Sequence, residues 1–232
     1  MKIIENTPLI KRNRLISKIV LYVTLAILII ELILALTNSP IAQGFGAYGV
    51  LLVAFFLVQF TVVFGNRWGR SPRIDEIINA ALKGLDDKYT LYHYMGKVSH
   101  LLIGPAGIWA INPFHQKGHI TYDTKKKKYV QKGGGNILSK TFTGDSIADV
   151  IHYSKLARND IKIMFEKYGI NKFPTPTIAN AFFDPEAEVK AQNGPELTIH
   201  MLKLKDYVRQ SAKKNFLSDS TISELTGKLP QE

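Results

Sequence analysis

Two long apolar segments near the N-terminus constrain the fold of this 232-residue chain more than any other feature. They cover residues 19–36 and 45–64, and each is about the length a helix needs to cross a hydrocarbon core of roughly 30 Å. Their few polar or tyrosine side chains are Tyr22, Thr24 and Glu31 in the first segment and Tyr48, Gln59 and Thr61 in the second. The sequence therefore predicts a transmembrane hairpin of two helices.

The charges around these segments predict their orientation. The connecting residues 37–44 carry no charge, and residues 1–73 hold eight Lys and Arg against two acids. The basic residues next to the spans are Lys11, Arg12, Arg14 and Lys18 on one side and Arg67, Arg70 and Arg73 on the other. Because positive flanks stay on the cytoplasmic side, both termini should be cytoplasmic. A cleaved signal peptide is disfavoured, since its apolar core would be shorter.

Glu31 is an acid within a predicted span, where ionisable groups are functional candidates. It lies five residues from the end of the first span, and Tyr48 should lie at a similar depth and can donate a hydrogen bond to it. A packing or interfacial role is favoured over ion transport, because two helices with one acid form a poor conduit. The spacing of Ala42, Gly46 and Val50 offers a faint contact face for a homo-oligomer through the hairpin.

The remaining chain alternates between helical and strand patterns and predicts an α/β domain with a central mixed sheet flanked by helices. Predicted helices cover 73–82 (with Ser71-Pro72 at its start), about 145–168 (capped by Asp145 or Ser146) and 205–213. Predicted strands cover 89–95, 98–103, 107–111, 119–123, 129–132, 177–183 and 197–202. The expected organisation is a hairpin region at 1–73, a soluble domain at 74–212 and a polar tail at 213–232. The absence of cysteine fits a cytoplasmic domain and excludes thiolate chemistry.

The stretch VSHLLIGPAGIWAINPFHQKGHI, residues 98–120, resembles the core of the nuclease-related domain (NERD) family, a relative of the restriction-endonuclease-like fold. In that family a strand bearing an Asp leads through a Gly-Pro-x-Gly turn into a strand ending Ile-Glu-x-Lys. The Asp, Glu and Lys positions correspond here to Ser99, Asn112 and Phe114. The resemblance extends over about residues 74–212 and implies the same fold, with the catalytic positions degenerate.

Nucleases of this class hold Mg²⁺ between two acids and use a Lys to position the attacking water. Neutral Ser99 and Asn112 supply no negative charge, and Phe114 cannot replace an ammonium group. Glu76 is a residual acid in a helix position of the family, although a first-turn helix acid is its simpler interpretation. We therefore predict no catalytic or metal site and no cofactor. The alternative is a metal-dependent phosphodiesterase with relocated ligands, which would bind Mg²⁺.

Histidines offer a weak substitute for the missing acids. His115 and His119 would share a strand face but lie about 13 Å apart. They and His100 are predicted to be ordinary surface or edge residues.

A basic turn formed by Lys125, Lys126, Lys127 and Lys128, with Tyr122 and Tyr129 on its two sides, is the best candidate for polyanion binding. A solvated turn is the first interpretation, anionic lipid the second and nucleic acid, bound weakly, the third. The sequence as a whole predicts a membrane-anchored protein with a cytoplasmic, catalytically inactive nuclease-related domain that acts as a binding or interaction module. It does not identify a protein partner.

Overall fold

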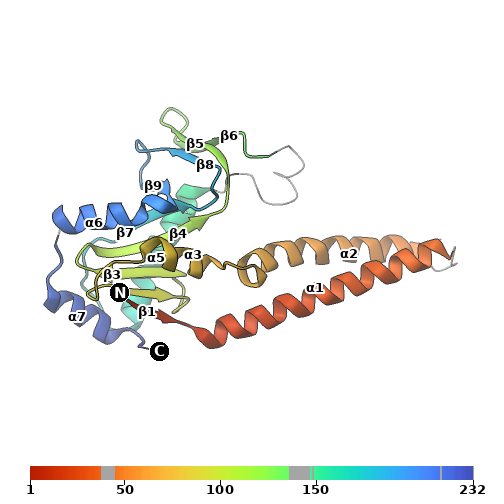
Figure 1. Ribbon diagram of the computed structural model, residues 1–232, viewed down its shortest axis with the longest axis horizontal. Helices are drawn as coiled ribbons and strands as arrows, with labels where there is room; N and C mark the ends of the chain where they lie inside the picture. Colours follow the sequence, from red (N-terminus) through yellow and green to blue (C-terminus); the bar gives the residue numbers. More distant parts are fainter. Residues whose placement is uncertain (38–44, 136–146, 148, 215, 232) are drawn as a thin grey trace. The chain divides into compact units, whose positions relative to one another are not determined.

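The computed structural model describes residues 1–37, 45–135, 147, 149–214 and 216–231 (Figure 1). The chain divides into two units, and each is described by itself. One unit is a helical hairpin within Thr7–Arg73, and the other joins Met1–Asn6 to the described residues that follow Arg73.

The hairpin consists of α1 (Thr7–Leu36), α2 (Phe45–Phe64) and the π-helix η2 (Gly65–Gly69). The two helices lie side by side in Figure 1, and both spans are long and apolar enough to cross a membrane. This property follows from length and composition and agrees with the prediction of two apolar helices. α1 begins twelve residues before the predicted span, so a basic segment continues the helix at its N-terminal end.

One side of α1 is buried. Ile10, Asn13, Ser17 and Thr24 are buried and recur at spacings of three, four and seven, which places them on one side of a helix. The hydroxyl oxygens of Thr24 and Thr61 lie 2.9 Å apart across the hairpin. A Cβ atom at Gly69 would lie 2.5 Å from the Ser17 hydroxyl oxygen, so glycine permits the close approach there.

The other unit is built on a mixed six-stranded sheet, as predicted. The strand order is β1-β2-β3-β4-β7-β9. The strands are β1 (Lys2–Glu5), β2 (Thr90–His93), β3 (His100–Gly104), β4 (Gly107–Phe114), β7 (Thr177–Phe182) and β9 (Leu197–His200). β2, β3 and β4 are antiparallel neighbours, whereas β1 pairs parallel with β2, and β7 pairs parallel with both β4 and β9.

Helices cover both faces of this sheet. Successive residues of a strand point to opposite faces, so Leu101 and Ile103 of β3 pack in one cluster and Leu102 in the other. The first cluster includes residues of α5 (Val150–Lys167) and α7 (Asp219–Lys228). The second includes α3 (Ile74–Leu82), the 3₁₀ helix η3 (Met201–Lys203) and α6 (Leu204–Lys214). The result is a helix–sheet–helix sandwich.

A second, three-stranded sheet of order β6-β5-β8 lies apart from the central one. It contains β5 (Gly118–Asp123), β6 (Lys128–Lys132) and β8 (Ala187–Lys190), with a small apolar cluster around Ile120, Phe114 and Phe182. The sequence predicted β5 and β6 but placed no strand at β8. In β8, Ala187 and Val189 alternate with Glu188 and Lys190, but four residues are too short a run to indicate a strand.

Both ends of the chain differ from the sequence prediction. Lys2–Glu5 forms an edge strand of the central sheet instead of a flank of the hairpin region 1–73, and Ile4 is buried in its core. The predicted polar tail 213–232 contains α7, which buries Ile222, Leu225 and Leu229. The predicted caps Asp145 and Ser146 lie outside the described residues. Asp149 caps α5 instead, and its carboxylate accepts a hydrogen bond from the His152 backbone N–H at 3.0 Å.

Candidate functional site

The three motif positions that the resemblance suggests lie in different local settings. Asn112 lies on β4, whereas Ser99 lies in a bend just before β3, and the β3–β4 pairing ends at Leu101 and Ala110, short of both residues. Phe114 lies at the end of β4, where its ring stacks on Phe182 with centroids 5.1 Å apart. The third motif position is therefore part of an apolar cluster.

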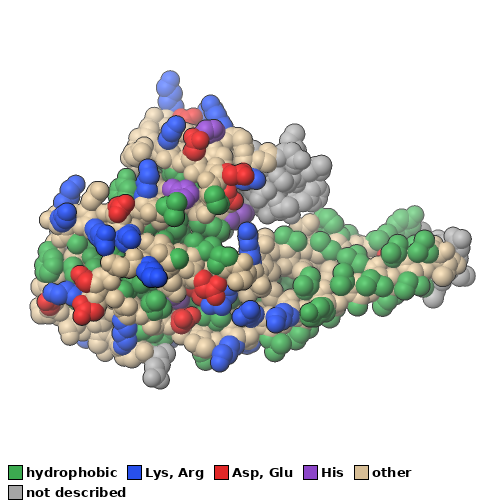
Figure 2. All heavy atoms as spheres, viewed as in Figure 1, with side chains coloured by type: hydrophobic (Ala, Val, Ile, Leu, Met, Phe, Trp, Pro, Cys, Tyr) green, Lys and Arg blue, Asp and Glu red, His purple; other side chains and the backbone are tan. Residues whose placement is uncertain are grey.

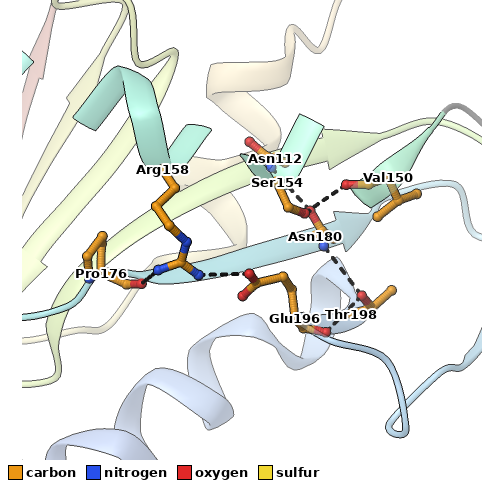
Figure 3. A network of polar contacts seen from close by, with 8 residues as sticks. All are labelled: Asn112, Val150, Ser154, Arg158, Pro176, Asn180, Glu196 and Thr198. Carbon is orange, nitrogen blue, oxygen red and sulfur yellow. Dashed lines mark hydrogen bonds and ion pairs between the residues drawn. The ribbon is translucent and has the colours of Figure 1, made fainter. Parts of the chain in front are cut away.

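Asn112 belongs to a network of neutral polar side chains, here called the amide–hydroxyl network, formed by Asn112, Ser154, Asn180 and Thr198 (Figure 3). Its centre is Asn180 on β7, which is fully buried and lies opposite Asn112 in the parallel β4–β7 pairing. The Asn180 Oδ1 atom lies 3.1 Å from both Asn112 Nδ2 and Ser154 Oγ. The Asn180 Nδ2 atom lies 3.5 Å from Thr198 Oγ1 on β9.

Two further contacts connect this network to its surroundings. The Tyr129 hydroxyl of the small sheet lies 2.8 Å from Thr198 Oγ1, and burial raises the pKa of this tyrosine. The Thr198 hydroxyl also donates to the Glu196 carbonyl at 3.1 Å. The Glu196 carboxylate is bound by Arg158 of α5 at 2.7 Å, so its charge is balanced (Figure 3).

The network offers hydrogen-bond donors and acceptors but no net charge. Binding of Mg²⁺ in proteins relies on carboxylates, since the ion gives up its water reluctantly. Among the residues that the structure describes, no three His, Asp or Glu side chains come together in a metal-binding arrangement. The amide–hydroxyl network can orient a polar ligand, or it can hold β4, β7, β9 and α5 in their relative positions.

Glu76 is not brought to this network. It lies in the first turn of α3, and α3 packs on the opposite face of the central sheet. The sheet therefore separates the residual acid from Asn112. A site that combined the two would need a different fold.

A pair of buried histidines was not predicted from the sequence. His93 and His100 are directly paired across β2 and β3 and are 0% and 2% exposed. Their Nδ1 atoms lie 2.7 Å apart, and His93 Nε2 lies 2.9 Å from Asn79 Oδ1. The expectation of a surface or edge position was wrong for His100. His93 ends one apolar strand and His100 begins the next, and this was the available signal. By contrast, His115 and His119 are exposed, as predicted.

The basic turn lies at the tip of the β5–β6 hairpin. One oxygen of the Asp123 carboxylate accepts the backbone N–H groups of Lys125 and Lys126, both at 3.0 Å. These hydrogen bonds hold the pKa of Asp123 below its ordinary value, and the bond from the Lys126 N–H has the largest effect. All four lysine side chains from Lys125 to Lys128 are exposed, and within the described chain none forms an ion pair. The turn is thus a fixed scaffold for four solvated charges.

Comparisons with known proteins give no information about this site. No protein-family model, no curated protein and no solved structure matches the chain. The geometry of the amide–hydroxyl network and the composition of the hairpin are therefore the two observations on which a function can be based.

Proposed function

We propose that this protein is anchored in a membrane by its hairpin and that its cytoplasmic domain is a nuclease-related, restriction-endonuclease-like module without catalytic activity, which serves in binding or interaction. The observation that carries the proposal is the amide–hydroxyl network around Asn180. It occupies the sheet position where the resemblance expects a metal-binding acid, Asn112, and it is neutral throughout.

The hydrogen bonds of the network support this proposal. Asn180 Oδ1 accepts a hydrogen bond from Asn112 Nδ2, and the Ser154 hydroxyl lies at the same distance from it while it also lies 2.7 Å from the Val150 carbonyl oxygen. A cation at this point would have to displace those donors and would gain no carboxylate in return. The cost of leaving buried donors without acceptors opposes such a change.

The pairing of β1 with β2 supports the anchoring geometry. β1 ends at Glu5 and α1 begins at Thr7, whereas the sheet resumes after α3, which begins at Ile74. If α1 and α2 cross a bilayer, both ends of the hairpin must therefore be on the same side of it. The basic flanks favour the cytoplasmic side.

One observation favours the alternative of a nuclease with relocated ligands. The Glu196 carboxylate is half-buried and lies two residues from Thr198, so an acid is close to the network. Its pairing with Arg158 at 2.7 Å weighs against a metal, because Arg158 would have to leave. This alternative can be tested directly.

The test is a cleavage assay on the full chain in detergent with Mg²⁺ or Mn²⁺ and single- or double-stranded DNA or RNA. We expect no cleavage above that of a mock purification, and the same background for Glu196→Gln and Glu76→Ala. Metal-dependent cleavage that either variant abolishes, and that the exposed control Glu166→Gln on α5 retains, would establish the alternative.

The anchoring is tested with single cysteines, which the natural chain lacks. Asn38→Cys lies in the loop between the spans, outside the described residues, and Ser223→Cys lies on the exposed side of α7. An impermeant thiol reagent on intact cells should label the first and not the second. Labelling of Ser223→Cys alone would reverse the orientation, and extraction of the protein by alkaline carbonate would exclude a membrane span.

A further inference from the structure

The N-terminal part of α1 is longer than a membrane span requires. α1 has 30 residues, whereas about 20 residues cross a hydrocarbon core. The surplus is Thr7–Lys18, which precedes the apolar run that begins at Ile19. Because it continues the same helix, its side chains project at the level of the lipid headgroups and just beyond them.

This surplus segment carries the cations Lys11, Arg12, Arg14 and Lys18, and Arg70 follows η2; together these five residues are here called the basic collar. All five are exposed, and within the described chain none forms an ion pair. Lys11, Arg14 and Lys18 recur at spacings of three and four, so they line one side of the helix. The nearest acid of α1 is Glu31, about 20 Å further along the helix axis from Lys18.

Large apolar side chains lie between these cations. Leu15, Ile16 and Ile19 are 59%, 36% and 51% exposed, whereas Ser17 faces the other helix and is buried. Exposed aliphatic groups next to Lys and Arg match the boundary between acyl chains and headgroups, where long cationic side chains reach toward the phosphates. In Figure 2, hydrophobic side chains cover the hairpin and basic ones gather at one of its ends.

We infer that the basic collar is a binding surface for anionic phospholipid headgroups in the leaflet on the side of the sheet domain. The inference rests on the proposed membrane anchoring and adds a lipid class to it. The phosphate is attracted by a row of cations held at fixed spacing on a helix, and the aliphatic side chains accept the acyl chains. The four lysines of the β5–β6 turn form a separate basic group without exposed apolar neighbours of this kind.

The test compares two triple variants that remove the same charge from different places. Lys11→Gln, Arg14→Gln and Lys18→Gln change the collar, and Lys125→Gln, Lys126→Gln and Lys127→Gln change the basic turn. The full chain, in micelles of a neutral detergent, is titrated with short-chain phosphatidylglycerol, with short-chain phosphatidylcholine, with inorganic phosphate and with a single-stranded oligonucleotide. Binding is followed by native mass spectrometry.

We expect phosphatidylglycerol to bind about 100-fold more tightly than phosphatidylcholine, as three cations near the headgroups would give, and the collar variant to lose most of that preference. The turn variant should retain it. Equal binding of the two lipids, loss of the preference only in the turn variant, or binding of inorganic phosphate as tight as that of phosphatidylglycerol would overturn the inference. So would an oligonucleotide that binds the collar more tightly than the lipid does.

Two controls keep the result decisive. The single variants Lys11→Gln and Lys18→Gln change exposed side chains away from the buried side of α1, and each should lose part of the preference if the triple variant does not fold. Extraction by alkaline carbonate reports on anchoring independently. A protein that resists extraction but shows no lipid preference contradicts the collar alone, whereas an extractable protein contradicts the anchoring itself.

Discussion

In the hairpin, hydroxyl side chains lie between the helices and most large apolar side chains are exposed, Ile10 and Trp68 excepted, whereas the sheet domain buries its large apolar side chains and exposes most of its charges. Thr24 contacts Thr61 of α2 and Ser17 lies against Gly69 of η2, while Phe56 is 62% exposed. In the domain, Phe165 of α5 is fully buried in the cluster that α5 and α7 share.

The contrast shows the same physical rule in two solvents. In water, removal of apolar surface drives packing, so the apolar face of each element turns inward. In lipid the outside is as apolar as leucine, and helices associate instead through close packing of small residues and a few hydrogen bonds. The exposed apolar side chains of the hairpin therefore agree with a location in lipid, and experiments can test the difference between the two regions.

The largest expected effect comes from truncating the same side chain in each region. Phe165→Ala should lower the free energy of unfolding of the domain by about 3–5 kcal/mol, because a fully buried ring leaves a cavity. Phe56→Ala, on the exposed side of α2, should leave domain stability unchanged. Hydrogen exchange of β4 and β7 in the full chain, reconstituted in lipid nanodiscs, measures both. Equal losses would contradict the separation into two differently packed units.

The next effect concerns buried polar groups in the domain. Asn180→Leu should cost about 2 kcal/mol, because the Asn112 amide loses its acceptor and the Thr198 hydroxyl loses the Asn180 amide, whereas Ser154 keeps the Val150 carbonyl oxygen. Asn159→Leu, on the exposed side of α5, is the matched control and should be near neutral. Chemical denaturation of the full chain gives the difference. A neutral Asn180→Leu variant would mean that the amide–hydroxyl network contributes no stability.

A smaller gain is expected at Tyr92, whose hydroxyl is buried without a hydrogen-bond partner within the described chain. Tyr92→Phe should raise the free energy of unfolding by about 1 kcal/mol. Burial raises the pKa of Tyr92 to about 12 from an ordinary 10.0, so its neutral form stabilises the fold fully below pH 10. That contribution is lost as the pH rises toward 12.

The measurement is unfolding at pH 8 and at pH 11 for the wild type and the variant. Between pH 8 and pH 11, the Tyr92→Phe variant should lose less stability than the wild type, because it lacks the contribution of the Tyr92 hydroxyl. Tyr153→Phe, at an exposed position on α5, is the control and should leave the alkaline loss unchanged. A wild type and a Tyr92→Phe variant that lose stability in parallel would contradict the assignment.

The smallest effect is expected between the helices of the hairpin. Thr24→Val and Thr61→Val remove the two hydroxyls that lie 2.9 Å apart, and a double-mutant cycle should give a coupling of about 0.6 kcal/mol. Steric-trap or single-molecule unfolding in bicelles can measure it. A coupling of several kcal/mol would show that this contact is far stronger than membrane hydrogen bonds usually are.

Local patterns predicted most elements of the domain but few of its side-chain contacts. The turn around Gly104 and Gly107 indicated the β3–β4 hairpin. Gly107 has a positive φ that other residues rarely adopt, and the Tyr89 ring leaves no room for a side chain at Gly104. Nothing in the sequence indicated that Asn180 would lie beside Asn112. These residues are 68 positions apart, and only the parallel pairing of β4 with β7 brings them together.

The sequence by itself determined the two apolar spans, the charges beside them, the short strands around glycine turns and the uncharged side chains at Ser99, Asn112 and Phe114. These properties depend on composition and on neighbours within a few residues. Only the tertiary structure decided that Lys2–Glu5 completes the sheet, that His93 meets His100 and that α7 closes the core. Each of these depends on a register between distant segments, and that register is set by the fit of the assembled core, which no local window of sequence contains.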